Sequence, residues 1–490
     1  MQEYDIVIGL EIHVQLKTKS KMFCSCSADY FGSDPNSHVC PTCLGLPGAL
    51  PRPNKKAIEN AIKVGLALNC EINLANKFDR KSYFYPDQAK GYQISQFDLP
   101  ININGWVNVG NRKIRINRAH QEEDTGKLIH QSVSGEKVSL VDFNRSGVPL
   151  LEIVSEPDIT SPEEARAYAK KIHQIMRYVG VADVDMEKAG MRFDANVSLK
   201  PKGAKELGTK VEIKNINSFS FLEKAINFEL GRQLEIIKDK GKIIQETRGW
   251  VESKGETVSQ RTKETSPDYR YFPDPDLPPL QFSKEEITAL KKELPELPEA
   301  KIERFESNYA LTNYEAKILA EDRQVADWFE KALEVYVEIE EPQADHIDST
   351  KAKKVANWVL GEFLRYLNEK QIGVNSTKAE PAHLAQLLIL IDKNEVSNQA
   401  AKQVFALVLE TGELPSKIIE DQGLKQESDK SAIEELVKAT IAENPKAIED
   451  FRGGKENSFD FLFGQIMRKT KGSANPSVVR DLLKTKLSKG

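Results

Sequence analysis

Three segments of the chain alternate apolar and polar residues with the period of a β-strand. Between residues 6 and 16 every even position is apolar, while the odd positions include Glu11, His13 and Gln15. Because side chains alternate between the two faces of a strand, this segment is predicted to bury one face and to present polar groups on the other.

The same pattern recurs in residues 191–200 and 210–214. Their polar faces carry, in order, Arg192, Asp194, Asn196, Ser198 and Lys200, and then Lys210, Glu212 and Lys214. For one strand alone, the solvated outer face of an antiparallel sheet explains such a pattern. Three strands that repeat it favour a shared polar site, and the solvated face stays open as the alternative.

Helix signals are clearest at two places in the first half of the chain. Ser161 is predicted to cap a helix over 165–178, with Glu164 completing a capping box. A second helix is predicted over 220–240, where Glu223 stands three residues after the first serine.

These patterns predict an α+β fold with three domains. Residues 1–290 are expected to form one large domain on a mainly antiparallel sheet, because short alternating runs and turn residues dominate there. After the proline-rich stretch 272–279, Ala, Leu, Glu and Lys recur at helical spacing, which predicts an all-α domain over 291–410. A polar stretch over 411–430 is typical of a linker, and it leads to a small helical tail domain over 431–490.

Composition narrows the class of protein further. The 490 residues are 40% hydrophobic and 29% charged, a balance that excludes wholesale disorder. The net charge is −5, so contact with nucleic acid requires a local basic patch, which the segment 464–490 offers with seven basic residues against Asp481. Without an apolar run of about 18 residues or a signal-peptide pattern, we expect no membrane span and a cytoplasmic protein.

Four of the five cysteines form two close pairs, Cys24 with Cys26 and Cys40 with Cys43. Two such pairs in the loop 24–43 suit one tetrahedral zinc ion, and four protein thiolates leave no open position for water. The zinc is therefore predicted to be structural. Four unrelated buried cysteines and an iron–sulfur cluster stay open as alternatives.

The segment 120–124 contains two adjacent glutamates, Glu122 and Glu123. One interpretation is an exposed acidic turn. In the other, the segment faces the same space as the polar strands, and an oxygen-rich site with one imidazole forms, which suits Mg²⁺ that holds nucleotide phosphates. The ligands of this predicted magnesium site are drawn from Glu11, His13, Glu122, Glu123, Asp194 and Glu212.

Two stretches interleave basic and aromatic side chains. One lies within 247–271 and includes Arg248, Trp250, Tyr269 and Arg270, and the other, 81–87, includes Lys81 and Tyr83. Such stretches suit stacking on unpaired bases and contact with phosphates at RNA ends, and a plain surface hairpin is the alternative for the first.

Several familiar motifs are missing from the sequence. It contains neither G-x-x-x-x-G-K-[ST] nor a G-x-G-x-x-G that opens a helix, so a bound nucleotide would lie in neither a P-loop nor a Rossmann fold. It also lacks G-x-S-x-G and the Ser-Gly-rich signature of an amidase nucleophile. Release of ammonia from an amide would therefore need another chain.

The motifs described above occur together, and in one order, in a known family. They are the segments 7–16, 24–51, 81–87, 120–124, 191–198 and 268–273. They closely resemble the B subunit of the aspartyl/glutamyl-tRNA amidotransferases, and residues 464–476 resemble the tail of that family. The resemblance covers essentially the whole chain. It implies a cradle domain, a helical domain and a tail that binds the body of tRNA.

The resemblance implies a two-step reaction on Glu-tRNA(Gln), and in many bacteria on Asp-tRNA(Asn). ATP phosphorylates the side-chain carboxylate with Mg²⁺, and ammonia from the amidase A subunit, which is joined through the small C subunit, displaces phosphate. The catalytic residues carried over are Glu11, His13, Glu123, Asp194 and Glu212, with Glu122 as an alternative metal ligand. Contacts with ATP are expected from Lys81, Tyr83, Asn196 and Lys214.

Two other functions stay open at this point. The first is a non-catalytic, zinc-containing adaptor that binds tRNA. The second is a free-standing ATP-dependent ligase that takes free ammonium.

Overall fold

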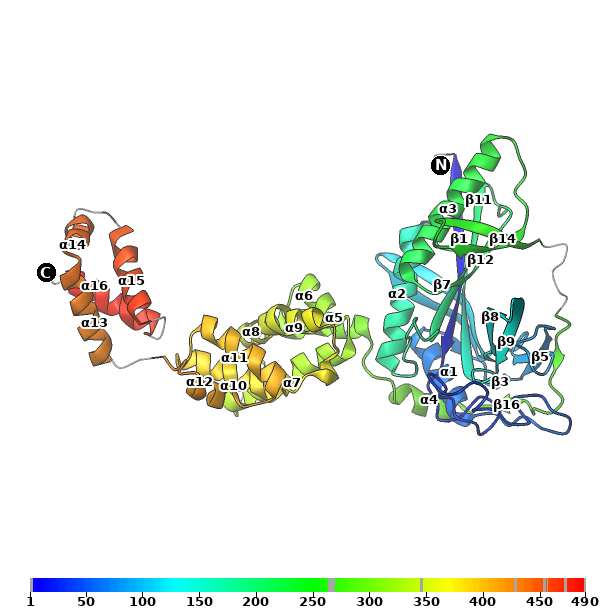
Figure 1. Cartoon of the computed structure of the whole chain (residues 1–490), viewed down its shortest axis with the longest axis horizontal. Helices are drawn as coiled ribbons and strands as arrows, with labels where there is room; N and C mark the ends of the chain where they lie inside the picture. Colours follow the sequence, from blue (N-terminus) through cyan, green and yellow to red (C-terminus); the bar gives the residue numbers. More distant parts are fainter. Residues whose placement is uncertain are drawn as a thin grey trace. The chain divides into compact units, whose positions relative to one another are not determined.

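The computed structural model of the chain (Figure 1) describes residues 3–262, 269–343, 347–426, 430–452, 455, 457–470 and 474–488. It divides into two compact units, Met1–Leu297 and Pro298–Gly490. The first unit holds the sheets, and the second is helical, which confirms the predicted α+β class with a mainly antiparallel sheet. The division falls at Leu297, seven residues beyond the boundary expected from composition, because α4 (Lys284–Lys292) packs with α1 in the first unit.

A nine-stranded sheet organises the first unit, and every neighbouring pair in it is antiparallel except β12 and β13. Its order is β14 (Glu256–Thr262), β13 (Glu246–Val251), β12 (Val211–Ile216), β11 (Met191–Pro201), β1 (Tyr4–Gln15), β10 (Pro149–Ser155), β7 (Arg112–Glu123), β6 (Asn102–Val109) and β2 (Glu71–Ile72). The three segments that alternate in the sequence are thus neighbours, β12, β11 and β1.

Three small sheets accompany the large one. They are β15 (Phe272–Pro273), β4 (Asp79–Ser82) and β5 (Tyr92–Ser95), then β8 (Lys127–Val133) with β9 (Glu136–Asp142), and β16 (Leu280–Gln281) with β3 (Ala75–Asn76). Figure 1 shows α2 and α3 on one side of β1, with β5, β8 and β9 on the other. The large sheet therefore has one face covered by helices and one face bordered by smaller sheets.

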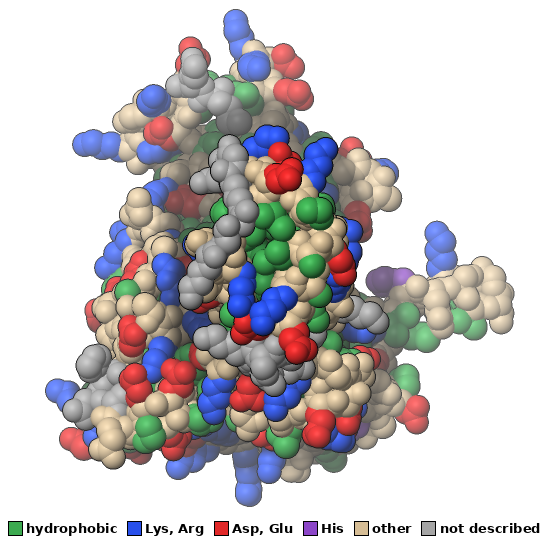
Figure 2. Space-filling view, turned by 90° about the vertical axis from the view of Figure 1, so that its left-hand side faces the viewer, with side chains coloured by type: hydrophobic (Ala, Val, Ile, Leu, Met, Phe, Trp, Pro, Cys, Tyr) green, Lys and Arg blue, Asp and Glu red, His purple; other side chains and the backbone are tan. Residues whose placement is uncertain are grey.

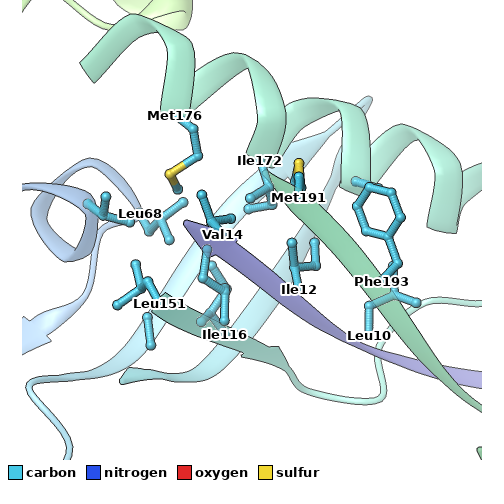
Figure 3. Packing of buried hydrophobic residues seen from close by; sticks show 14 of the residues in the cluster. Leu10, Ile12, Val14, Leu68, Ile116, Leu151, Ile172, Met176, Met191 and Phe193 are labelled. Atoms are coloured by element: carbon cyan, nitrogen blue, oxygen red, sulfur yellow. The ribbon is translucent and has the colours of Figure 1, made fainter. Parts of the chain in front are cut away.

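The helix-covered face is the hydrophobic core of the first unit. Its helices are α1 (Lys55–Ala67), α2 (Pro162–Val179) and α3 (Phe219–Lys238). Figure 3 shows Ile172 and Met176 of α2 above the even-numbered residues of β1, Leu10, Ile12 and Val14, all of which are fully buried. Burial of these apolar side chains stabilises the fold by about 1.5–3 kcal/mol for each large one.

The ends of α2 and α3 follow the sequence signals only in part. Ser161 caps α2 as predicted, since its hydroxyl accepts from the Glu164 amide, but the Glu164 carboxylate accepts from the Thr160 amide and does not close the expected box. The N-cap of α3 lies two residues before the predicted start at Ser220, and the helix itself begins at Phe219. Ser218 is its cap, and Glu223 pairs with Arg166.

The second unit is built from helices. They are α5 (Pro298–Tyr309), α6 (Asn313–Leu319), α7 (Arg323–Glu340), α8 (Ser349–Trp358), α9 (Leu364–Lys370), α10 (Pro381–Asp392), α11 (Asn398–Thr411), α12 (Pro415–Asp421), α13 (Lys430–Glu443), α14 (Pro445–Arg452), α15 (Asn457–Lys469) and α16 (Pro476–Ser488). One hydrophobic core includes Phe305, Trp328 and Phe405, and a separate core includes Val437 and Leu483.

The segment expected to be a linker is partly helical. Helix α12 lies inside 411–430, and its Ile418 and Ile419 are buried in the core around Phe405. The low apolar content of the stretch hid this helix, because two isoleucines are enough to fix a two-turn helix against an existing core. Residues 427–429 lie outside the described part of the chain.

Charge is mixed over the face of the molecule in Figure 2, where Lys and Arg lie among Asp and Glu. This agrees with the small net charge of −5. None of the helices in the described part of the chain combines the length and apolar character that a membrane crossing requires.

Candidate active site

Strand register brings three predicted site residues, together with two others, to the uncovered face of the large sheet. Glu11 on β1 is the direct partner of Asp194 on β11. On the other side, His13 pairs with Glu152 on β10, and Glu152 pairs with His120 on β7. Directly paired residues point to the same face of a sheet, so all five side chains lie on the face opposite the core.

This face borders a cavity of about 610 Å³. Of the predicted site residues, the lining includes His13, Lys81, Tyr83, Glu122, Asp194 and Lys214. Its other walls come from Tyr85, Asp87, Gln88, Gln93, Asp124, Thr125, Gly126, Leu128, Leu150, Arg145, Arg192, Asn215, Thr247, Gln260 and Tyr269. The cavity is large enough for a nucleotide-sized ligand and is lined mainly by polar groups.

Glu11, Asp194 and Glu212 form a three-carboxylate cluster, because one oxygen of each lies within 4.8 Å of the others. Lys214 compensates the charge, with its Nζ 3.0 Å from Asp194 Oδ2 and 2.9 Å from Glu212 Oε1. Oxygen ligands at this spacing suit a hard divalent cation such as Mg²⁺. The strand register thus brings Asp194 close to Glu11 and Glu212, as the sequence pattern predicted.

Neutral groups orient the three-carboxylate cluster. Asn196 Nδ2 donates to Glu11 Oε1 at 3.0 Å, and Thr247 Oγ1 donates to Glu212 Oε2 at 2.9 Å. The pKa of Asp194 is lowered because Lys214 and His13 outweigh the effect of its burial. The pKa of Glu11 is raised, first by burial and then by the charge of Glu152. Asn196, expected to contact ATP, therefore acts on a carboxylate in this structure.

A second group of ligand atoms, the histidine cluster, consists of His13, Glu122 and Glu152, which also lie within 4.8 Å of one another. His13 Nε2 is 3.4 Å from Glu152 Oε2, and Lys81 Nζ is 3.7 Å from Glu122 Oε1. Burial opposes charge on His13, but the hydrogen bond to Glu152 and its charge raise the pKa of His13 above the ordinary value. Lys81 overcomes the burial of Glu122 and lowers its pKa to about 2.

Glu123 does not join either cluster. Its carboxylate contacts Lys90 Nζ and accepts from the Ile94 amide at 3.0 Å. It lines a separate cavity of about 110 Å³ beside Cys43. Adjacent residues point to opposite sides of the strand, so only Glu122 of the pair faces the 610 Å³ cavity.

Sequence reasoning missed two contributors to this site. Glu152 is the single charged residue in the apolar strand β10, and that interruption was the available signal. Asp124 is 2% exposed and accepts from Gln15 Nε2 at 2.7 Å and from Arg192 at 3.1 Å. Arg192 and Arg145 outweigh the burial of Asp124 and lower its pKa to about 2.

The aromatic segments enclose the cavity. Tyr83 stacks on Tyr85 with ring centroids 5.7 Å apart, and Lys81 Nζ lies 5.2 Å from the centroid of Tyr269. Arg248 points away from the cavity, into a buried network with Glu229 and Glu246. From Thr247 to Thr262 the stretch forms a hairpin, because β13 and β14 pair with each other.

The four cysteines form a compact cluster that could hold a metal ion. Their sulfur atoms all lie within 4.8 Å of one another, and Cys40 Sγ is 3.8 Å from Cys43 Sγ. A tetrahedral zinc ion with bonds of about 2.3 Å requires sulfur atoms about 3.8 Å apart, so the donor set fits the ion. A hydrogen bond from Cys24, with help from the Cys40 amide and Lys21, lowers the pKa of Cys43.

The antiparallel sheet places side chains from both acidic clusters and two fixed lysines on one cavity, a donor set of the kind that enzyme domains use to handle phosphates with divalent cations. Comparison with family models matches residues 6–288 to the GatB/GatE catalytic domain and residues 344–487 to the GatB domain. The chain belongs to the family of aspartyl/glutamyl-tRNA(Asn/Gln) amidotransferase B subunits, which confirms the resemblance seen in its motifs.

Two relatives illustrate the similarity, and both are B subunits of aspartyl/glutamyl-tRNA(Asn/Gln) amidotransferases. The protein from Carboxydothermus hydrogenoformans is 50% identical over 494 residues, which cover 100% of both chains. The protein from Persephonella marina is 48% identical over 485 residues, which cover 98% of this chain and 99% of its own. The likeness thus extends through both compact units of the chain.

Proposed function

We propose that this chain is the ligase subunit of a heterotrimeric amidotransferase that converts Glu-tRNA(Gln) to Gln-tRNA(Gln) and Asp-tRNA(Asn) to Asn-tRNA(Asn) with ATP. The observation that carries the proposal is that the three-carboxylate cluster and the histidine cluster both contribute side chains to the cavity that Lys81 and Lys214 line. Membership of the family of B subunits supports it.

The proposed reaction has two steps, phosphorylation of the substrate carboxylate and displacement of the phosphate by ammonia. An oxygen of the substrate's side-chain carboxylate attacks the γ-phosphorus of ATP, and the bond to ADP breaks, which leaves an acyl phosphate. The nitrogen of ammonia then attacks the acyl carbon, the carbon–oxygen bond to phosphate breaks, and the amide forms with loss of a proton. In both steps negative charge must be held close to negative charge.

The chain's own residues address this repulsion. Lys81 and Lys214 place two fixed ammonium groups on the cavity, and the surrounding carboxylates outweigh burial and raise the pKa of both. The three-carboxylate cluster and the histidine cluster would hold divalent cations, which screen the charge of phosphate oxygens when bound. Asn196 and Thr247 keep Glu11 and Glu212 in position for this role.

The remaining parts of the proposal concern supply and recognition. The sequence lacks an amidase nucleophile, so ammonia comes from the amidase A subunit, with the small C subunit joining the two chains. The four cysteines hold a structural zinc, and the helical tail binds the tRNA body in the cytoplasm, where charged tRNA is made. The comparisons support neither a non-catalytic adaptor nor a free-standing ligase.

The test follows radioactive γ-phosphate from ATP in the assembled complex, with ammonium chloride in place of glutamine. Phosphate release that depends on misacylated tRNA, with one amide formed per phosphate, is expected. An adaptor predicts no ATP cleavage in the complex. A free-standing ligase predicts amide formation by this chain without its partners.

A further inference from the structure

Lys21 is a fully buried cation in the zinc-binding region. Its side chain has no exposed surface, and its Nζ donates to the backbone oxygens of His38 at 2.7 Å and Phe143 at 3.3 Å. The third neighbour is Cys43 Sγ at 3.7 Å. Among the residues that the structure describes, no carboxylate lies within ion-pair distance of this ammonium group.

A buried ammonium without an anionic partner is strongly unfavourable. The anion that meets Lys21 is therefore the four-cysteine centre itself. Four thiolates around one divalent ion carry a net charge of about −2, and this charge is also buried and needs compensation. A metal-bound thiolate of Cys43, 3.7 Å from Lys21 Nζ, would meet both requirements.

The same ammonium group touches the segment that leads into the catalytic cavity. Phe143, whose oxygen accepts from Lys21, lies two residues before Arg145. The Arg145 guanidinium donates to the oxygens of Thr125 at 2.9 Å and Gly126 at 2.7 Å, and all three residues line the 610 Å³ cavity. Next to them, the Gly147 amide donates to the Asp124 oxygen at 2.9 Å.

Further hydrogen bonds and contacts join the zinc loop to residues 143–148. The Met22 amide donates to the Gly147 oxygen at 2.7 Å, and the His38 amide donates to Asn144 Oδ1 at 2.7 Å. At Gly147, with φ of +86°, an added Cβ would lie 3.5 Å from Lys21 Cδ and 3.6 Å from Cys43 Cβ. The zinc loop and residues 143–148 therefore form one packed layer with Lys21 inside it.

We propose that Lys21 is a positioning residue that compensates the charge of the metal-bound thiolates and couples the zinc centre to the cavity wall around Arg145. The inference rests on the proposed zinc site. A purely structural Lys21 would serve only to satisfy two backbone oxygens, and a neutral donor could do that as well.

The test compares Lys21→Gln, which keeps a donor, with Lys21→Arg, which keeps the charge, in the full chain within its complex. Zinc transfer to a chromogenic chelator is timed. We expect Lys21→Gln to release zinc about 10-fold to 100-fold faster than the unsubstituted chain, and Lys21→Arg to lie closer to it. Lys19→Gln, at an exposed position two residues away, is the matched control and is expected to change nothing.

Hydrogen exchange supplies a second readout, since the amides of residues 124–126 and 143–148 are expected to exchange faster in Lys21→Gln than in Lys19→Gln. Equal zinc release from Lys21→Gln and Lys21→Arg overturns the role of charge, and unchanged exchange overturns the coupling. If Lys21→Gln does not fold, the test uses Lys21→Arg alone. Zinc release from Lys21→Arg that is 10-fold faster than from the unsubstituted chain would then contradict the proposal. A chain without zinc contradicts it too, while ATP-dependent amidation, measured separately, still tests the proposed function.

Discussion

Glu11 and Asp194 are direct cross-strand partners on β1 and β11, although 183 positions separate them in the sequence. Their carboxylates meet Glu212 within 4.8 Å, on the face of the sheet that the helices leave uncovered. Three carboxylates at this distance repel one another unless a cation lies between them. Lys214 supplies one positive charge in this structure, and a divalent cation would supply more.

Asp194→Asn tests this cluster, because it keeps the size of the side chain and removes one charge. We expect a folded complex that still binds tRNA and hydrolyses glutamine, with tRNA-dependent ATP cleavage reduced by about 10²-fold or more. The measurement is release of phosphate from ATP. Asp5→Asn, farther along the same strand pair, is the control, and near-normal amidation by Asp194→Asn would contradict the role.

Glu122→Gln and Glu123→Gln separate two neighbours that the sequence left as alternatives. Since Glu122 faces the large cavity and Glu123 contacts Lys90, only the first is expected to weaken binding of Mn²⁺ as a substitute for Mg²⁺. Loss of a ligand should lower affinity by about 10-fold or more. Calorimetric titration with Mn²⁺ checks this, and equal losses in both variants would mean that the assignment to Glu122 is wrong.

Thr247→Val keeps the shape of the side chain but removes the hydroxyl that donates to Glu212. A mispositioned carboxylate should raise the Mg²⁺ concentration needed for half-maximal ATP cleavage by about 10-fold, because the hydrogen bond orients a proposed ligand. Thermal unfolding followed by circular dichroism is expected to stay close to normal. An unchanged Mg²⁺ requirement would show that Thr247 does not position Glu212.

Metal removal should divide the cysteines into two classes. At pH 8 a chelator is expected to expose Cys24, Cys26, Cys40 and Cys43 to iodoacetamide, while Cys70 stays unmodified until the chain unfolds. Cys70 is buried in the core, where burial also raises its pKa to about 12, whereas Cys24, Cys26 and Cys40 are only half-buried. Mass spectrometry of the alkylated protein counts the modified thiols.

The raised pKa of Cys70 also makes the free energy of unfolding depend on pH. The folded state favours the protonated Cys70 thiol, so its contribution to the free energy of unfolding is complete below the ordinary pKa of about 8.5 and is lost as pH rises toward 12. Cys70→Ser should flatten this alkaline decline. Rapid alkylation of Cys70 in the native chain at pH 8 would contradict the prediction.

The tail offers a test of tRNA binding by local charge. Arg468 and Lys484 are exposed, whereas Lys469 and Lys486 pair with Glu443 and Glu434. Replacing Arg468 and Lys484 together by Ala should raise the KM for aminoacyl-tRNA and reduce the slope of log affinity against log salt by about 2.

Glutamine hydrolysis in the complex controls for assembly of the tail variant, and filter binding at several salt concentrations measures the slope. A parallel truncation should begin after Gln426, because removing α12 as well would open the core that holds Ile418 and Ile419. If KM and slope both stay unchanged, the tail does not contact the phosphate backbone through these residues.

Local patterns in the sequence were sufficient to predict the α+β class, the polar faces of β1, β11 and β12, the cluster of four cysteines and the family. Alternation of side chains and spacing of thiols are local properties that one chain displays directly. Only the tertiary structure decided the rest. Register selected Glu122 over Glu123, added Glu152 from an otherwise apolar strand, and turned Asn196 toward Glu11. The buried place of Lys21 beside Cys43 was equally invisible, because contacts between distant segments depend on packing and not on local pattern.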